Sequence, residues 1–244
     1  MIRALGLALL CGIGSVASAQ AETVTVAVAA NFTAVAEELA ALFKAETGHD
    51  AVLSFGATGQ LYAQITQGAP FGVFLSADDV RPTQAVAEGH GVDGSVFTYA
   101  IGQLALFSTS LDLADGEAVL RAGAYEKLAI ADPAAAPYGA AAIEALTALD
   151  LLAATEPKFV TGANITQTLQ FVDTGNAELG FVALSQVAGR DRVWIVPAEL
   201  HAPIRQDAVL LKSAADNPAA TAFIDFLKSA AARERIAAAG YSVE

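Results

Sequence analysis

The chain has 244 residues, 55% of them hydrophobic, and its 26 acidic against 13 basic residues give a formal net charge of −13. An acidic balance of this size argues against nucleic-acid binding, which depends on basic patches. The single cysteine, Cys11, lies near the start of the chain, so the rest offers no thiol for disulfides, thiol catalysis or metal ligation.

The first 21 residues are typical of a secretory signal peptide. A basic start precedes an apolar run over residues 4–16, and small residues follow it. We expect cleavage after Ala19 or Ala21. Leu10, directly before Cys11, is a poor match to a lipoprotein cleavage site. No later stretch reaches the roughly 18 apolar residues of a membrane span, so the leader predicts an unanchored periplasmic protein.

The first half of the remaining chain alternates apolar strands with amphipathic helices. Valines at every second position predict a buried strand over residues 24–29, and an apolar stripe at helical spacing follows it over 34–46. The same unit recurs twice. The pairs are a strand over 51–55 with a helix over 60–67, and a strand over 72–75 with a helix over 78–87.

An uninterrupted apolar segment over residues 99–107 predicts another buried strand and opens a second round of the alternation. The elements expected after it are strands at 128–130, 158–160, 180–183 and 206–211, with helices at 138–151, 166–173 and 218–239. Such alternation predicts an α/β fold of mostly parallel sheets flanked by helices.

About 220 residues exceed one typical domain and fit two lobes of about 100 residues each. No linker rich in proline, glycine and serine separates the halves. We therefore expect hinge strands near Tyr99 and Arg205 to join the lobes. The expected domains are the signal peptide over 1–21, lobe 1 over 22–99 plus 205–244, and lobe 2 over 100–204.

Five predicted strands run through small or hydroxyl residues directly into a helix. The junctions are residues 30–33, 56–59, 76–78, 132–139 and 162–165. A helix start leaves backbone N–H groups without intrahelical partners and carries a partial positive charge. In α/β folds these starts lie beyond the carboxyl ends of the strands. The junctions therefore predict an anion site between the lobes that needs no lysine or arginine.

Each junction also has an ordinary structural interpretation. Asn31 and Thr33 are common helix N-caps. Tyr138 fits a surface aromatic that covers the core, and Asp78 and Asp79 are expected partners of a helix dipole.

Motifs for other chemistry are missing from the sequence. The segment over 56–59 lacks the lysine of a phosphate-binding P-loop, and no strand leads into a dinucleotide fingerprint. The three histidines share no metal-ligand spacing, and no Gly-x-Ser-x-Gly elbow supplies a nucleophile. We therefore predict no catalytic residues.

Several segments resemble the periplasmic molybdate-binding protein family of ABC importers. They are Val-Ala-Val-Ala-Ala-Asn-Phe-Thr (26–33), Gly-Ala-Pro-Phe-Gly-Val-Phe-Leu-Ser-Ala-Asp (68–78), Thr-Tyr-Ala-Ile-Gly-Gln-Leu (98–104), Ala-Pro-Tyr-Gly (136–139) and Glu-Leu-Gly-Phe-Val-Ala-Leu-Ser-Gln (178–186). The resemblance implies the two-lobed type II fold of periplasmic binding proteins, with molybdate or tungstate held by neutral donors. The ligand-binding residues that it implies are Ala30, Asn31, Thr58, Ala77, Tyr138 and Ile165.

The resemblance also implies a monomer without a cofactor. Molybdenum or tungsten is then bound only as the oxyanion, with no direct bond from protein to metal. The expected partners are a membrane permease and its cytoplasmic ATPase. Alternatives are a receptor for sulfate, phosphate or ferric iron on the same architecture, or a periplasmic α/β transferase or hydrolase. Ferric iron would need clustered tyrosines or carboxylates, and the five tyrosines are scattered along the sequence.

Overall fold

The computed structural model describes residues 21–243. The signal peptide predicted over residues 1–21, with Cys11, lies almost wholly outside the described residues and stays a prediction. Within the described part, no single helix is long and apolar enough to cross a membrane. Two helical segments pass that test only as a pair, over 137–148 and 152–158, and they are bent by 115°.

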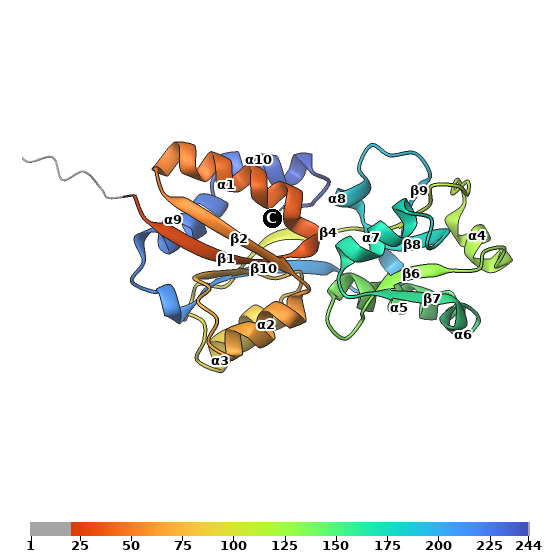
Figure 1. The fold of residues 1–244 in the computed structure, drawn as a ribbon, viewed down its shortest axis with the longest axis horizontal. Helices are drawn as coiled ribbons and strands as arrows, with labels where there is room; N and C mark the ends of the chain where they lie inside the picture. Colours follow the sequence, from red (N-terminus) through yellow and green to blue (C-terminus); the bar gives the residue numbers. More distant parts are fainter. Residues whose placement is uncertain (1–20, 244) are drawn as a thin grey trace, which may run out of the picture.

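The described residues form two five-stranded sheets, each flanked by helices (Figure 1). The first sheet has the order β2-β1-β3-β10-β4. Its strands are β1 (Thr23–Ala29), β2 (Asp50–Gly56), β3 (Val73–Leu75), β4 (Phe97–Gly102) and β10 (Ile204–Leu210). The helices around it are η1 (Ala30–Phe32), α1 (Thr33–Thr47), α2 (Thr58–Thr66), α3 (Val80–Ala87), η4 (Lys212–Ala214), α9 (Pro218–Leu227) and α10 (Ala230–Ala238).

The second sheet has the order β7-β6-β8-β5-β9. Its strands are β5 (Leu104–Phe107), β6 (Leu128–Ala131), β7 (Phe159–Gly162), β8 (Leu179–Ala183) and β9 (Val193–Ile195). The helices around it are α4 (Gly116–Ala122), α5 (Pro137–Ala148), α6 (Leu152–Thr155), η2 (Glu156–Lys158), α7 (Ile165–Asp173), α8 (Leu184–Val187) and η3 (Ala198–Leu200).

Both sheets are mixed, whereas the alternation of elements predicts mostly parallel ones. In the first, β1 is parallel to β2 and β3, and β10 is antiparallel to β3 and β4. In the second, β6 is parallel to β7 and β8, and β5 is antiparallel to β8 and β9. The antiparallel strands β5 and β10 follow the passages of the chain between the sheets, so no helical crossover sets their direction.

Two predicted elements are split in the structure. The expected strand over 99–107 breaks at Gln103, so that β4 belongs to the first sheet and β5 to the second. The expected helix over 218–239 breaks after α9, where the Ser229 hydroxyl accepts a hydrogen bond from Ala232 N–H and caps α10. The sequence does not reveal the second break, because no proline or glycine stands between residues 219 and 239.

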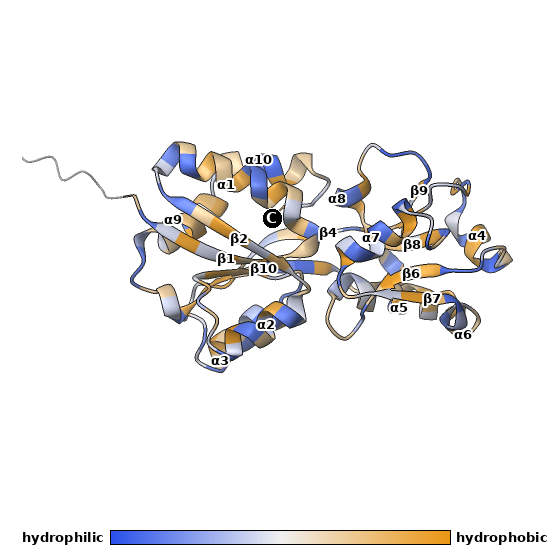
Figure 2. Ribbon diagram, in the orientation of Figure 1, coloured by the Kyte–Doolittle hydropathy of each residue, from blue (hydrophilic) through white to orange (hydrophobic). Residues whose placement is uncertain are grey.

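The hydrophobic core covers both faces of each sheet. In the first sheet α1, α9 and α10 lie on one side, and α2 and α3 lie on the other (Figure 1). Phe43 of α1 and Phe223 of α9 pack edge to face, with ring centroids 5.1 Å apart. Figure 2 shows β6 in hydrophobic colours, whereas hydrophilic and hydrophobic segments alternate along α1. This packing holds the carboxyl ends of β1, β6 and β7 in place, and η1, α5 and α7 begin shortly after these three ends.

Candidate functional site

All six residues implied by the resemblance line one small cavity between the sheets. The lining residues are Ala29, Ala30, Asn31, Gly56, Ala57, Thr58, Ala77, Ala136, Pro137, Tyr138 and Ile165. The lining contains no charged side chain. A ligand in this cavity would therefore be contacted by neutral groups only.

Five of these residues lie at or next to helix starts. Ala30 and Asn31 are the first two residues of η1, which leads into α1; Thr58 and Ile165 are the first residues of α2 and α7. Tyr138 is the second residue of α5. Backbone N–H groups at these positions have no acceptor within their own helix, and helix starts carry partial positive charge. The starts of four helices, attached to both sheets, therefore line the cavity.

The start of α5 sits directly on the end of β6. A Cβ at Gly139 would collide with the Ala131 carbonyl, so only glycine permits this approach. Pro137 occupies the first turn, where its missing N–H costs nothing. The Ala-Pro-Tyr-Gly turn thereby places Tyr138 beside the cavity.

Thr58 and Ala77 act as a pair. The Ala77 N–H donates to the Thr58 hydroxyl oxygen at 3.0 Å, and the two residues are 2% and 1% exposed. Ala77 therefore lines the cavity, but its N–H is used inside the protein. Because the Thr58 oxygen accepts this bond, its own hydrogen is available to a ligand.

The side chain of Asn31 caps no helix. Its amide nitrogen donates to Gln206 Oε1 at 2.9 Å and to the Tyr241 hydroxyl at 3.0 Å. The N-caps of η1 and α1 are Ala29 and Phe32, neither with a side-chain bond. The capping interpretation of Asn31 is therefore wrong. Both hydrogens of its amide are used, which leaves its backbone N–H for a ligand.

Tyr138 is 2% exposed, and its hydroxyl oxygen accepts a hydrogen bond from Gln206 Nε2 at 3.1 Å. Burial raises the pKa of Tyr138 well above its usual value, and nearby Tyr241 adds to the shift. The phenol is therefore neutral and can donate its hydrogen. The interpretation of Tyr138 as a surface aromatic is wrong, because β4 and β10 cover its ring tip.

Behind the cavity lies a buried polar network that the sequence analysis missed. Gln206 of β10 contacts Asn31, Tyr99 and Tyr138, and Tyr241 contacts Asn31 and Ser185. The sequence signal is weak, because Gln206 stands between the charged residues Arg205 and Asp207 at the start of β10. Because its partners are distant along the chain, local pattern could not assign it a role.

Hydrogen bonds also join the segments attached to the two sheets around the cavity. Gly59 N–H donates to the Ala135 carbonyl at 2.8 Å, and the Thr166 hydroxyl donates to the Ala30 carbonyl at 3.2 Å. On another side the Ser185 hydroxyl donates to the Asn31 carbonyl at 3.3 Å. Hydrogen bonds between segments attached to the two sheets thus enclose the cavity.

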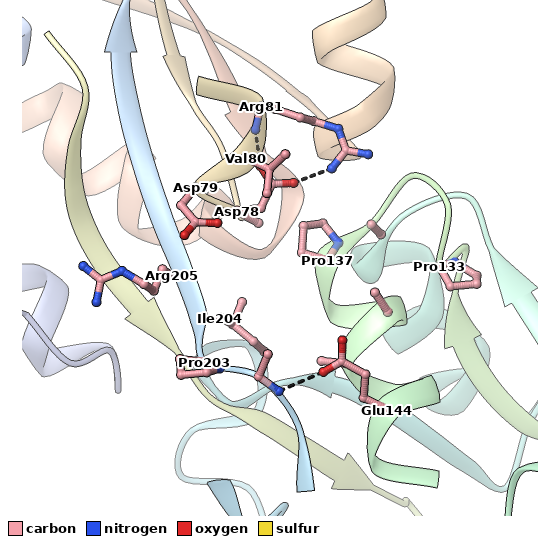
Figure 3. A pocket seen from close by; sticks show the side chains of 15 residues that line it. Asp78, Asp79, Val80, Arg81, Pro133, Pro137, Glu144, Pro203, Ile204 and Arg205 are labelled. Atoms are coloured by element: carbon pink, nitrogen blue, oxygen red, sulfur yellow. Dashed lines mark hydrogen bonds and ion pairs between the residues drawn. The ribbon is translucent and has the colours of Figure 1, made fainter. Parts of the chain in front are cut away.

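A larger cavity of about 250 Å³ adjoins the small one and shares Ala77, Ala136 and Pro137 with it (Figure 3). Its charged lining residues are Asp78, Asp79, Arg81, Glu144 and Arg205. Arg81 pairs with Asp78, and Glu144 accepts a hydrogen bond from Ala202 N–H at 2.8 Å (Figure 3). The carboxylates make this cavity the less favourable of the two for an anion.

The described residues include no group of three or more histidine, cysteine, aspartate or glutamate side chains that could hold a metal ion. His49 contacts Phe43 and the Glu22 N–H, and His201 contacts a neighbouring carbonyl, so neither lines the small cavity. Asp78 accepts a hydrogen bond from Arg81 N–H at the start of α3, in agreement with its interpretation as a partner of a helix start. The uncharged lining of the small cavity, with helix starts and hydroxyl groups, favours a ligand that is rich in hydrogen-bond acceptors.

Comparisons with known proteins find relatives that bind solutes. A family model described as "bacterial extracellular solute-binding protein" matches residues 24–242. The chain is 51% identical to the molybdate-binding protein ModA of Rhodobacter capsulatus, over 100% of this chain and 97% of that one. It is 52% identical to ModA of Azotobacter vinelandii, over 93% of this chain and 92% of that one.

The periplasmic molybdate-binding protein of Azotobacter vinelandii has a similar solved structure. The TM-score is 0.87 at 39% identity, and the match covers 91% of this chain and 99% of that one.

Proposed function

The chain belongs to the bacterial extracellular solute-binding protein family, and we propose that its solute is molybdate, bound in the small cavity between the two halves. Two relatives more than half identical over nearly the whole chain are named for this ligand. The observation that carries the proposal is the lining of the cavity: helix starts and hydroxyl groups, with no charged side chain.

Family membership settles two of the sequence predictions. Proteins of this family bind solutes and are not enzymes, as the lack of a catalytic motif predicts. The periplasmic binding protein fold is also confirmed, since two helix-flanked α/β sheets match the solved relative over nearly its full length. The resemblance stated from sequence segments is thereby confirmed.

The proposed ligand-binding groups are the backbone N–H groups of Ala30, Asn31, Tyr138 and Ile165 together with the Thr58 and Tyr138 hydroxyls. Ala77 acts through Thr58. A doubly charged anion can be buried without cations only if its oxygens accept hydrogen bonds from preorganised donors. A lining of donors also rejects a protonated phosphate, whose O–H finds no acceptor. Sulfate is smaller, so fewer donors reach it at hydrogen-bond distance.

Lobe closure follows from the same geometry. We place lobe 1 at residues 22–99 plus 205–244 and lobe 2 at 100–204, joined where the chain passes from β4 to β5 and into β10. Ala30, Asn31 and Thr58 belong to the first lobe, and Tyr138 and Ile165 to the second. A ligand that contacts both lobes binds the closed state more tightly and shifts the equilibrium toward it.

The protein is proposed to act as a monomer in the periplasm. There it would bind molybdate or tungstate without a cofactor and deliver it to the permease of an ABC importer with its cytoplasmic ATPase. The extracellular solute-binding family supports this location. Tungstate is included because its tetrahedral oxyanion presents the same acceptors.

The proposal is tested by thermal unfolding and calorimetry of the ligand-stripped protein with molybdate, tungstate, sulfate and phosphate in parallel. At a free ligand concentration of one hundred times Kd, binding adds about 2.7 kcal/mol to the free energy of unfolding. We expect Tm to rise with the logarithm of molybdate or tungstate concentration and to change little with sulfate or phosphate. A flat response to both metal oxyanions excludes the proposed ligand.

A further inference from the structure

Gln206 occupies an unusual position for a glutamine. It is 0% exposed on β10, at the point where the β10–β4 register shifts between Gln206 and Asp207. A buried amide costs free energy unless its donors and acceptors are paired. Here Oε1 accepts hydrogen bonds from Asn31 Nδ2 at 2.9 Å and from the Tyr99 hydroxyl at 3.1 Å. Nε2 donates to the Tyr138 hydroxyl at 3.1 Å.

The partners of Gln206 come from both sides of the cavity. Asn31 follows β1 of the first sheet, whereas Tyr138 belongs to α5, which packs on the second sheet. Both residues line the small cavity, and Gln206 does not. The Gln206 amide therefore holds two residues of the cavity lining in place, although Gln206 itself lies outside the lining.

The direction of these hydrogen bonds determines what each lining residue can offer. Because the Tyr138 oxygen accepts from Gln206, its single phenolic hydrogen is left for another acceptor, for which a ligand competes with the neighbouring Tyr241 hydroxyl. The Asn31 amide gives one hydrogen to Gln206 and the other to Tyr241, so its nitrogen is held away from the ligand. Gln206 thus presents Tyr138 as a donor.

The packing around this contact leaves little freedom. A Cβ at Gly102 would collide with the Tyr138 hydroxyl and lie 2.6 Å from Gln206 Nε2. Gly102 ends β4 immediately before the chain enters the second sheet. The Tyr138–Gln206 contact is therefore enclosed by backbone where the chain passes between the halves.

We propose that Gln206 is a positioning residue of the oxyanion site, which orients the Tyr138 hydroxyl as a donor and locks the Asn31 side chain. The inference rests on the proposed function and extends it, because it assigns the donor character of the lining to a residue outside the cavity. It predicts that Gln206 contributes to affinity and to the rejection of oxyanions that carry a hydrogen.

The test compares Gln206→Met, Gln206→Glu and Tyr138→Phe with the wild type. Met has a similar size and removes the amide; Glu keeps the shape but, when ionised, offers no hydrogen to Tyr138. We expect Gln206→Met to weaken molybdate binding about tenfold to a hundredfold. Gln206→Glu should weaken it further, because Tyr138 then donates to the carboxylate and the new charge repels the anion.

A double-mutant cycle separates positioning from a general structural effect. If Gln206 acts through Tyr138, then Tyr138→Phe costs much less affinity in the Gln206→Met background than in the wild type. The control is Tyr62→Phe, whose hydroxyl bonds Glu88 away from the cavity, and this change should leave affinity unchanged in either background. Tyrosine difference absorbance on adding molybdate gives a spectroscopic readout, expected to shrink in both Tyr138→Phe and Gln206→Met.

Ligand selectivity gives a further readout, because a loss of stability alone does not change the ratio of two affinities. The ratio of arsenate to molybdate affinity should rise in Gln206→Glu, where a carboxylate faces the Tyr138 side of the site. Wild-type affinity and absorbance in both Gln206 variants, or full additivity with Tyr138→Phe, would overturn the inference. If Gln206→Met does not fold, Gln206→Glu serves in the same cycle. Failure of the wild type to bind molybdate instead rejects the proposed function.

Discussion

At the scale of single residues, the cavity is built from groups whose hydrogens are directed by other groups. Ala77 supplies no N–H to a ligand, yet its bond to Thr58 determines where the threonine hydrogen points. Burial keeps the neighbouring phenols protonated: it raises the pKa of Tyr241 to about 12 and that of Tyr138 well above its usual value. The side chains nearest the cavity are thus neutral, and a dianion meets no phenolate.

Thr58→Ala tests this arrangement. The change removes the proposed hydroxyl donor and leaves the buried Ala77 N–H without its partner, so molybdate affinity should fall by about 1 to 3 kcal/mol. The conservative Thr58→Ser keeps the hydroxyl and should bind within a few-fold of wild type. Calorimetric titration measures both, and an unchanged Kd for the alanine variant would remove the Thr58 hydroxyl from the site.

At the scale of elements, β10 combines three roles. It pairs antiparallel with β3 and β4, it carries Gln206 behind the cavity, and it places Asp207 beside the acidic start of α3. The side chain of Asp207 accepts a hydrogen bond from the Thr98 hydroxyl at 2.7 Å. Burial raises the pKa of Asp207, Asp79 and Asp78 raise it further, and the Thr98 bond and Arg205 oppose the shift.

The raised pKa of Asp207 has a defined effect on stability. The folded protein binds this proton more tightly than the unfolded chain, so the contribution of Asp207 to stability falls as pH rises from about 4. Asp207→Asn imitates the protonated form and can still accept from Thr98. The variant should therefore have a higher Tm than wild type at pH 7, and the difference should vanish near pH 4.

Thermal unfolding across this pH range measures the effect. Asp225→Asn on α9 is a matched control, because the Asp225 side chain is 72% exposed and its distance to Lys228 is 3.8 Å. That variant should follow the wild-type Tm at each pH. A wild-type Tm for Asp207→Asn at pH 7 would show that the charge of Asp207 costs the fold nothing.

At the scale of the whole molecule, an acidic protein is proposed to bind an anion. The net charge is −13, and carboxylates line the cavity that adjoins the proposed site. Like charges slow the encounter at low salt, and added salt screens the repulsion. The binding free energy must therefore come from short-range hydrogen bonds after closure and not from long-range attraction.

Stopped-flow kinetics at different salt concentrations test this view. Between about 10 and 150 mM sodium chloride the Debye length falls from about 30 to about 8 Å, so the molybdate association rate should rise. The dissociation rate should change little, because the bound anion is enclosed. Asp79→Asn should raise the association rate at low salt. A rate that falls with added salt would instead indicate electrostatic attraction.

The sequence alone determined the α/β alternation and the junctions where strands meet helices. These are local properties: valine alternation predicts β1, an apolar stripe predicts α1, and unpaired N–H groups belong to any helix start. The resemblance to a known family then named Ala30, Thr58, Tyr138 and Ile165 at these junctions, and the structure gathers them around one cavity. Their contact with molybdate stays a prediction.

The hydrogen-bonding roles of the side chains around the cavity depend on tertiary packing. The partners of Asn31 lie 175 and 210 residues further along the chain, so no local pattern could distinguish a locked amide from a helix cap. The same holds for Gln206, and for the break at Gln103 that assigns one apolar run to two sheets. Helix starts depend on neighbouring residues, whereas the direction of a buried hydrogen bond depends on every group that packing brings within reach.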